Sequence, residues 1–167
     1  MSKRKVKVMV SLAAVIVVAV LIFIFSSQDG SESSALSGAI TEWVVAHLVP
    51  GFRDMAEADR LRIMDTAHLI VRKAAHFSEY ALLALTLVIY LHYILEHRKP
   101  TFMALVAWIA ATLYACTDEL HQMFVVARGP AVTDVCIDSG GALAGALVGL
   151  ILVVLRLGYK AKRARLA

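Results

Sequence analysis

Three titratable side chains and an amide stand directly after a long apolar run. They are Asp118, Glu119, His121 and Gln122, and the run before them covers residues 102–116. An ionisable group in or beside the hydrocarbon of a membrane costs several kcal/mol unless it is paired or faces water. We therefore take this stretch as the centre of a candidate functional site.

A second group of polar side chains leads into another apolar run. Arg72, His76 and Glu79 follow one another at i, i+4 and i+7, so a helix presents them on one face, with Tyr80 beside them. Lys73 is rotated away from this face, and we expect it to point toward lipid or headgroups.

Two carboxylates one helical turn apart, Asp134 and Asp138, lead into a third apolar run. At 1.5 Å of rise per residue, Glu79, Asp118 and Asp138 lie about 26 to 27 Å from the opposite ends of their helices, with a histidine one turn beyond two of them. Because three spans place carboxylates at one depth, we expect these side chains to meet in a polar cluster.

The composition is that of a membrane protein. Of the 167 residues, 60% are hydrophobic, and the mean hydropathy is +0.74, whereas roughly half of the residues of a soluble domain are apolar. A bilayer core of about 30 Å needs about 20 helical residues. We predict an all-α fold, a polytopic membrane helical bundle in a single domain over residues 1–167. Its four transmembrane helices cover about 8–25, 74–95, 101–117 and 136–155.

Basic residues predict the orientation. Eleven of the 17 Lys and Arg residues lie before the first span, in the 96–100 loop and in the tail 156–167. By the positive-inside rule we expect a multi-pass protein of the cell membrane with both termini cytoplasmic, so that 26–73 and 117–135 face outward. Since the basic residues belong to tails and one short loop, nucleic acid is not an expected partner. The first run is too long for the core of a signal peptide, and we expect an uncleaved anchor.

The outward segment 26–73 predicts interfacial helices between the first and second spans. From Ser33, apolar side chains recur at three- and four-residue intervals until Pro50 and Gly51 end the pattern. A second stretch from about Ala56 runs into the second span. Trp43 suits the level of the headgroups.

Small residues in the fourth span and two thiols are further features of the sequence. Gly141, Gly145 and Gly149 recur every four residues and predict a face at which the fourth span approaches another helix closely. Cys116 and Cys136 both fall near the outer end. They could form a disulfide there or remain two free thiols, and the sequence leaves both alternatives.

Several motifs occur in a fixed order along the chain. They are Phe25-Ser26-Ser27-Gln28, Arg72-Lys73-x-x-His76-Phe77-x-Glu79-Tyr80, Asp118-Glu119-x-His121-Gln122-x-Phe124, and Arg128 followed by Asp134 and Asp138. Together they resemble the VanZ-like family of small membrane proteins over nearly the whole chain. One departure is the turn 127–130, where that family has a Pro-Gly-Arg type of sequence. The resemblance implies a cell-envelope role and a link with tolerance of glycopeptide antibiotics such as teicoplanin. It supplies no reaction.

One interpretation of the cluster is an enzyme acting on a lipid-linked envelope molecule. Glu79 or Asp118 would serve as general base or nucleophile, and His76 or His121 as proton shuttle. An arginine would hold phosphate. The candidate substrate-binding residues are Arg72, Tyr80, Gln122, Arg128, Asp134 and Asp138.

A divalent metal is a sharper form of the same idea. Imidazole and carboxylate side chains suit Zn²⁺, Mn²⁺ or Fe²⁺. The candidate ligands are His76, Glu79, Asp118, Glu119, His121 and Asp138. The sequence has neither a His-Glu-x-x-His motif nor a cysteine pair of zinc-ribbon spacing, so metal as a cofactor stays open.

Two further interpretations of the cluster are open. It could bind a lipid headgroup or a glycopeptide without turnover, in which case membrane lipid and that ligand are its partners. Alternatively the charges are structural, pairing with one another or stabilising helix ends. A structural role predicts that each substitution lowers thermal stability in proportion to the function lost.

Overall fold

The computed structural model describes residues 2–27, 30–125 and 131–166, and within these ranges the chain is helical without a strand. The predicted all-α fold is therefore confirmed. The elements are α1 (Lys3–Ser26), α2 (Gly30–Leu48), a 3-10 turn η1 (Phe52–Asp54), α3 (Glu57–Ile94), α4 (Pro100–Gln122) and α5 (Val132–Arg165). Four of them, α1, α3, α4 and α5, are long and apolar enough to cross a membrane.

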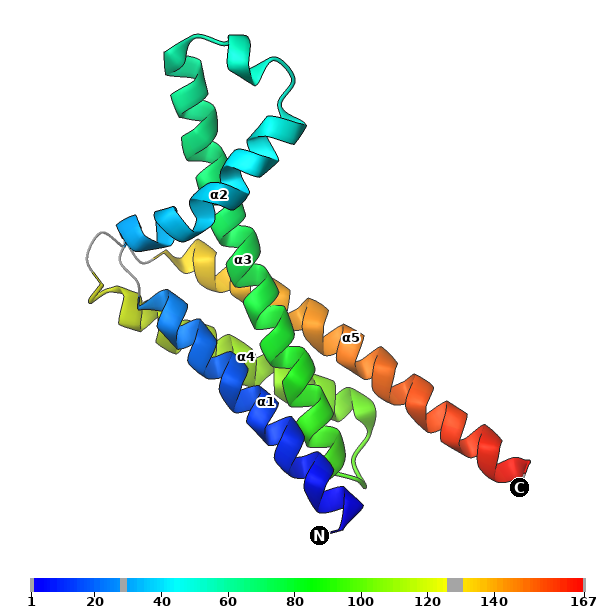
Figure 1. Cartoon of the computed structure of the whole chain (residues 1–167). Coiled ribbons are helices and arrows are strands. Elements are labelled where there is room, and N and C mark those ends of the chain that lie inside the picture. The colour runs from blue at the N-terminus through cyan, green and yellow to red at the C-terminus, as the bar shows by residue number, and fades with distance from the viewer. Residues whose placement is uncertain (1, 28–29, 126–130, 167) are drawn as a thin grey trace.

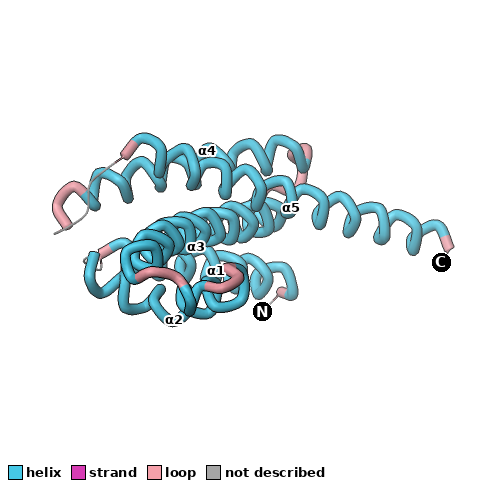
Figure 2. Tube along the Cα trace, turned by 90° about the horizontal axis from the view of Figure 1, so that it is seen from above, coloured by secondary structure: helices cyan, strands magenta, loops and turns pink. Residues whose placement is uncertain are grey.

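α3 is the central helix of the bundle. It contacts each of the other four α-helices, and its most extensive contact is with α5. Figure 2 shows α3 between α1 on one side and α4 on the other. In both views α5 runs alongside α3, and its last turns extend away from the bundle (Figures 1 and 2). Residues placed on α3 are therefore the ones that can meet side chains from every other span.

Glycines account for the closeness of α3 and α5. A Cβ atom at Gly141 would overlap the carbonyl oxygen of Phe77, and one at Gly145 would overlap the carbonyl oxygen of Ala81. The prediction of a small-residue face is thus confirmed, and its partner lies within the same bundle. Such faces let helix backbones approach in a membrane, where packing rather than hydrophobicity drives association.

α2 and the first half of α3 form a hairpin that extends beyond the ends of α1 and α4 (Figure 1). Gly51, with φ of 71°, makes the left-handed turn between its two arms, a conformation that costs glycine little. Val45 is buried between the arms, and Thr41 Oγ1 lies 3.2 Å from His68 Nδ1. As predicted, the second arm continues without a break into a span.

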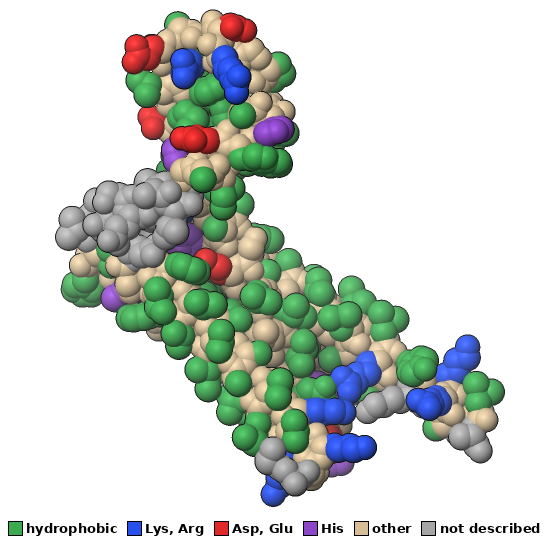
Figure 3. Space-filling model, in the orientation of Figure 1, with side chains coloured by type: hydrophobic (Ala, Val, Ile, Leu, Met, Phe, Trp, Pro, Cys, Tyr) green, Lys and Arg blue, Asp and Glu red, His purple; other side chains and the backbone are tan. Residues whose placement is uncertain are grey.

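Charge divides the bundle into two ends. Lys and Arg side chains gather at the end that carries both termini (Figure 3), which we call the basic end. There Arg4 pairs with Glu96 at 3.1 Å, and Arg156 donates to the hydroxyl of Tyr93 at 2.7 Å. The opposite end, which we call the acidic end, holds the final turns of α1 and α4, the first turns of α5 and the middle of α3.

Candidate functional site

Three buried polar side chains, one from each of three helices, meet at the acidic end. Tyr80 of α3, Asp118 of α4 and Asp138 of α5 are 0%, 4% and 4% exposed. The hydroxyl of Tyr80 faces the carboxylate of Asp118, and both aspartates interact electrostatically with Tyr80. We call these three residues the Asp–Asp–Tyr site.

Further carboxylates surround the site. Asp138 lies within electrostatic range of Asp118, Asp134, Glu119 and Glu79, so carboxylates from α3, α4 and α5 converge here. Charges of one sign gathered in a medium of low dielectric repel one another strongly. Each therefore needs a proton, a hydrogen-bond donor or a cation, and the structure shows which of them have one.

Two polar atoms of the site have no hydrogen-bond partner among the residues that the structure describes. They are the hydroxyl oxygen of Tyr80 and Oδ1 of Asp138. Although Tyr80 faces Asp118, its geometry does not make a hydrogen bond. A buried polar group left unsatisfied costs about 1–3 kcal/mol, so two such atoms at one place are unusual for purely structural packing.

Asp118 is oriented by its own helix and by α1. Gln122 Nε2 donates to Asp118 Oδ2 at 3.1 Å and to Ser26 Oγ at 3.0 Å. Gln122 and Ser26 are themselves buried. The amide therefore ties the end of the first span to the carboxylate and fixes the direction in which Asp118 points.

His121 also contacts α1, but through other partners than Gln122. Its Nε2 is 3.2 Å from Ser27 Oγ, and its ring centroid lies 4.9 Å from that of Phe23. Asp118 is therefore bonded by Gln122, four residues on, rather than by His121, three residues on. Sequence spacing allows both pairings, and in the structure the ring of His121 turns to Ser27 and Phe23 of α1 instead.

The two acidic residues at the junction of α4 and α5 have partners of their own. Glu119 Oε1 accepts a hydrogen bond of 2.5 Å from the backbone N–H of Ala131, the residue before α5 begins. Asp134, in the first turn of α5, forms an ion pair with Lys73. The expectation that Lys73 points toward lipid is wrong.

The reason for the changed position of Lys73 lies in the packing of α5. The glycines of α5 dock against Phe77 and Ala81, which share a stripe of α3 with Lys73 at four-residue intervals. This is the stripe that the sequence predicts to face lipid or headgroups. Because α5 covers it, the lysine meets Asp134 instead of the headgroups.

On the neighbouring face of α3, His76 Nδ1 lies 3.8 Å from Glu79 Oε2, with both side chains partly buried. Arg72, half-buried one turn away, makes no ion pair with the part of the chain that is described. Arg128 lies outside the described residues. The two arginines expected to hold phosphate therefore have no described contact with the Asp–Asp–Tyr site.

A metal site would need the candidate metal ligands to come together. Across residues 2–27, 30–125 and 131–166, no group of three or more His, Cys, Asp or Glu side chains is arranged to hold a metal ion. His121 and Glu119, two of the six candidate ligands, face other partners. Cys116 and Cys136 are both free thiols, the first half-buried and the second exposed.

Ser26 and Ser27, at the end of α1, are part of the site region although the sequence did not predict a place in the candidate site for them. Both hydroxyls contact α4 residues of the acidic end. The signal was present, since two serines end an apolar span directly before a polar loop, but nothing in the sequence placed α1 against α4.

The comparisons with known proteins confirm the family that the sequence resembles. A family model described as VanZ/LLP1 matches residues 11–154 of the 167-residue chain, a range that contains the whole Asp–Asp–Tyr site. No curated protein and no solved structure matches the chain. With four spans in the structure and a match over most of its length, this multi-pass membrane protein belongs to the VanZ/LLP1 family.

Proposed function

We propose that the protein binds a lipid-linked molecule of the cell envelope at its acidic end and acts on it by acid–base chemistry. The observation that carries the proposal is the Asp–Asp–Tyr site, in which Asp138 Oδ1 and the Tyr80 hydroxyl are buried without a partner among the described residues. In this scheme Asp138 accepts a proton from the ligand. Asp118, held by Gln122, stays in place as the second carboxylate.

An amphiphilic ligand suits the surroundings of the site. Leu120 and Phe124, on and just beyond the last turn of α4, are 59% and 86% exposed. Both side chains lie at the same end of the bundle as the carboxylates and are open to the hydrocarbon of a bound lipid. Ligand pockets combine apolar walls with a few placed polar groups in this way.

The distribution of charge supports an outward site. The basic end carries both termini and the 96–99 loop, and the positive-inside rule assigns such an end to the cytoplasm. The acidic end would then meet envelope molecules on the outer surface. We further propose that sequestering such a molecule alters the exposure of the cell envelope to glycopeptide antibiotics such as teicoplanin.

A second candidate function is binding without turnover. It is favoured by the partners that Glu119, Asp134 and Glu79 already have, which leave few groups for proton transfer. The two functions differ in what an amide in place of Asp138 would do to a bound ligand.

The test is to extract the protein with its surrounding lipid into polymer-bounded discs and to identify the co-purified lipids by mass spectrometry. The wild type is compared with Asp138→Asn and with Glu96→Gln, an acid-to-amide control at the basic end. We expect a lipid-linked envelope molecule to be enriched in the wild type and the control. Retention of an unprocessed form by Asp138→Asn would support an enzyme. Its loss from this variant would show that Asp138 is needed for binding, in an enzyme or in a binding protein. Lipids identical to the bulk membrane in all three samples would refute the proposal.

A further inference from the structure

Among the described residues, the acidic end has more carboxylates than Lys and Arg side chains. Of the carboxylates within range of Asp138, Asp134 is paired with Lys73 and Glu119 with a backbone N–H. Glu79 lies against His76. Asp118 receives one amide hydrogen. Removing charge from water is expensive unless an opposite charge offsets it, and for Asp138 the described residues supply none.

The unpartnered atoms are suited to a donor. Asp138 Oδ1 accepts hydrogen bonds when ionised, and the Tyr80 oxygen can accept or donate one. Both side chains are more than nine-tenths buried and flank Asp118 from α5 and α3. A phosphate brings negative charge and acceptors only, so these carboxylates would repel it. A primary ammonium brings one positive charge and three N–H donors.

Aromatic rings add to this preference. Tyr80 and Tyr114 have ring centroids 6.3 Å apart, and the hydroxyl of Tyr114 is turned toward α1, where it donates to the carbonyl oxygen of Ala19 at 2.9 Å. Tyr114 therefore presents ring, not hydroxyl, toward Tyr80. Ring faces attract ammonium groups.

We propose that the Asp–Asp–Tyr site receives a protonated primary amine carried by a membrane-anchored ligand, with Asp118 and Asp138 as counter-charges. This inference rests on the proposed function, because it specifies the polar group of the ligand that the site would bind. The polar atoms of the site are all oxygens. A hard inorganic cation such as Na⁺ or Mg²⁺ is therefore the alternative ligand that would compete with the amine.

The experiment measures thermal unfolding of the purified full chain in micelles, titrated with lysophosphatidylethanolamine. Two matched lipids serve as controls: lysophosphatidylcholine, whose nitrogen is methylated, and lysophosphatidylglycerol, which has no amine. We expect a saturable rise in melting temperature with the first lipid and at least tenfold weaker apparent affinity for the other two. Asp138→Asn and Tyr80→Phe should each weaken the first interaction at least tenfold, whereas Glu96→Gln should not.

Three results would overturn the inference. The first is equal affinity for the three lipids. The second is a wild-type response that Asp138→Asn retains. The third is a saturable stabilisation by sodium or magnesium chloride that displaces the amine lipid. If a lipid-linked molecule still co-purifies in discs, only the amine is refuted and the proposed function stands.

Discussion

Gly145→Ala tests whether contact between α3 and α5 holds the acidic end together. The added methyl group would overlap the carbonyl oxygen of Ala81. A backbone oxygen cannot rotate out of the way, so the two helices must separate. Since α5 carries Asp138 and α3 carries Tyr80, the separation also widens the Asp–Asp–Tyr site.

The magnitude follows from a control on the same helix. A Cβ atom at Gly158 meets nothing within 4 Å, so Gly158→Ala should gain about 0.5–1 kcal/mol from helix propensity alone. Gly145→Ala has the same gain and adds an overpacking cost of about 1–3 kcal/mol. The difference in free energy of unfolding between the two variants is therefore the packing term itself, about 1–3 kcal/mol.

The assay is thermal unfolding of the purified variants in one detergent. One kcal/mol shifts the midpoint of a chain of this size by about 2–4 °C, so Gly145→Ala should melt several degrees below Gly158→Ala. Equal midpoints would refute the close packing of α5 on α3, and with it the reason that Lys73 meets Asp134.

The remaining predictions concern single contacts and orientation. Trp108→Phe removes the hydrogen bonds from the indole nitrogen to the carbonyl and hydroxyl oxygens of Ser139, both 3.2 Å. It should cost about 1 kcal/mol in thermal unfolding, and an unchanged midpoint would contradict the contact. Lys73→Met breaks an ion pair whose side chains are 38% and 33% exposed, so the loss should not exceed about 1 kcal/mol; a larger loss would mean that the pair is shielded from solvent. Cys136 is exposed at the acidic end, and a membrane-impermeant maleimide should label it in intact cells when Cys116 is replaced by serine. Labelling only after permeabilisation would reverse the proposed orientation.

The fold was predictable because hydrophobic patterns report burial directly. The four spans, the unbroken passage from the outer helix into the second span and the glycine face of α5 all depend on periodicities within one segment. The shared depth of Glu79, Asp118 and Asp138 was likewise calculable from helical rise. What each segment touches was harder to predict, since it depends on how the helices rotate against one another.

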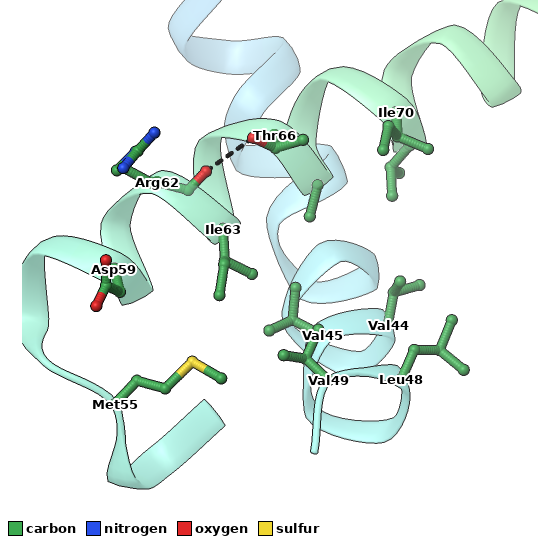
Figure 4. Close-up of a pocket in the computed structure, with 12 residues that line it drawn as sticks. Val44, Val45, Leu48, Val49, Met55, Asp59, Arg62, Ile63, Thr66 and Ile70 are labelled. Carbon is green, nitrogen blue, oxygen red and sulfur yellow. Dashed lines mark hydrogen bonds between the residues drawn. The ribbon is translucent and has the colours of Figure 1, made fainter. Parts of the chain in front are cut away.

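Lys73 and His121 illustrate that limit. The sequence predicts that the stripe with Arg72, His76 and Glu79 faces inward and that Lys73 faces lipid or headgroups. In the structure the docking of α5 covers the stripe with Lys73. Helix spacing allows Asp118 to pair with His121 or with Gln122. The structure pairs it with Gln122, while the ring of His121 contacts Ser27 of α1. A pocket of about 790 Å³ in the outer hairpin, lined mainly by apolar side chains of α2 and α3 such as Val45, Leu48 and Ile63 (Figure 4), had no signal in the sequence.

The most direct test of the central claim is the thermal stability of ligand-free Asp138→Asn. If Asp138 is an unpaired carboxylate kept for a ligand, asparagine removes its repulsion with the neighbouring carboxylates, and the variant should melt at or above the wild-type midpoint while losing ligand binding or turnover. A lower midpoint, matched by a proportional loss of function, would show that Asp138 is a structural residue and would contradict the account.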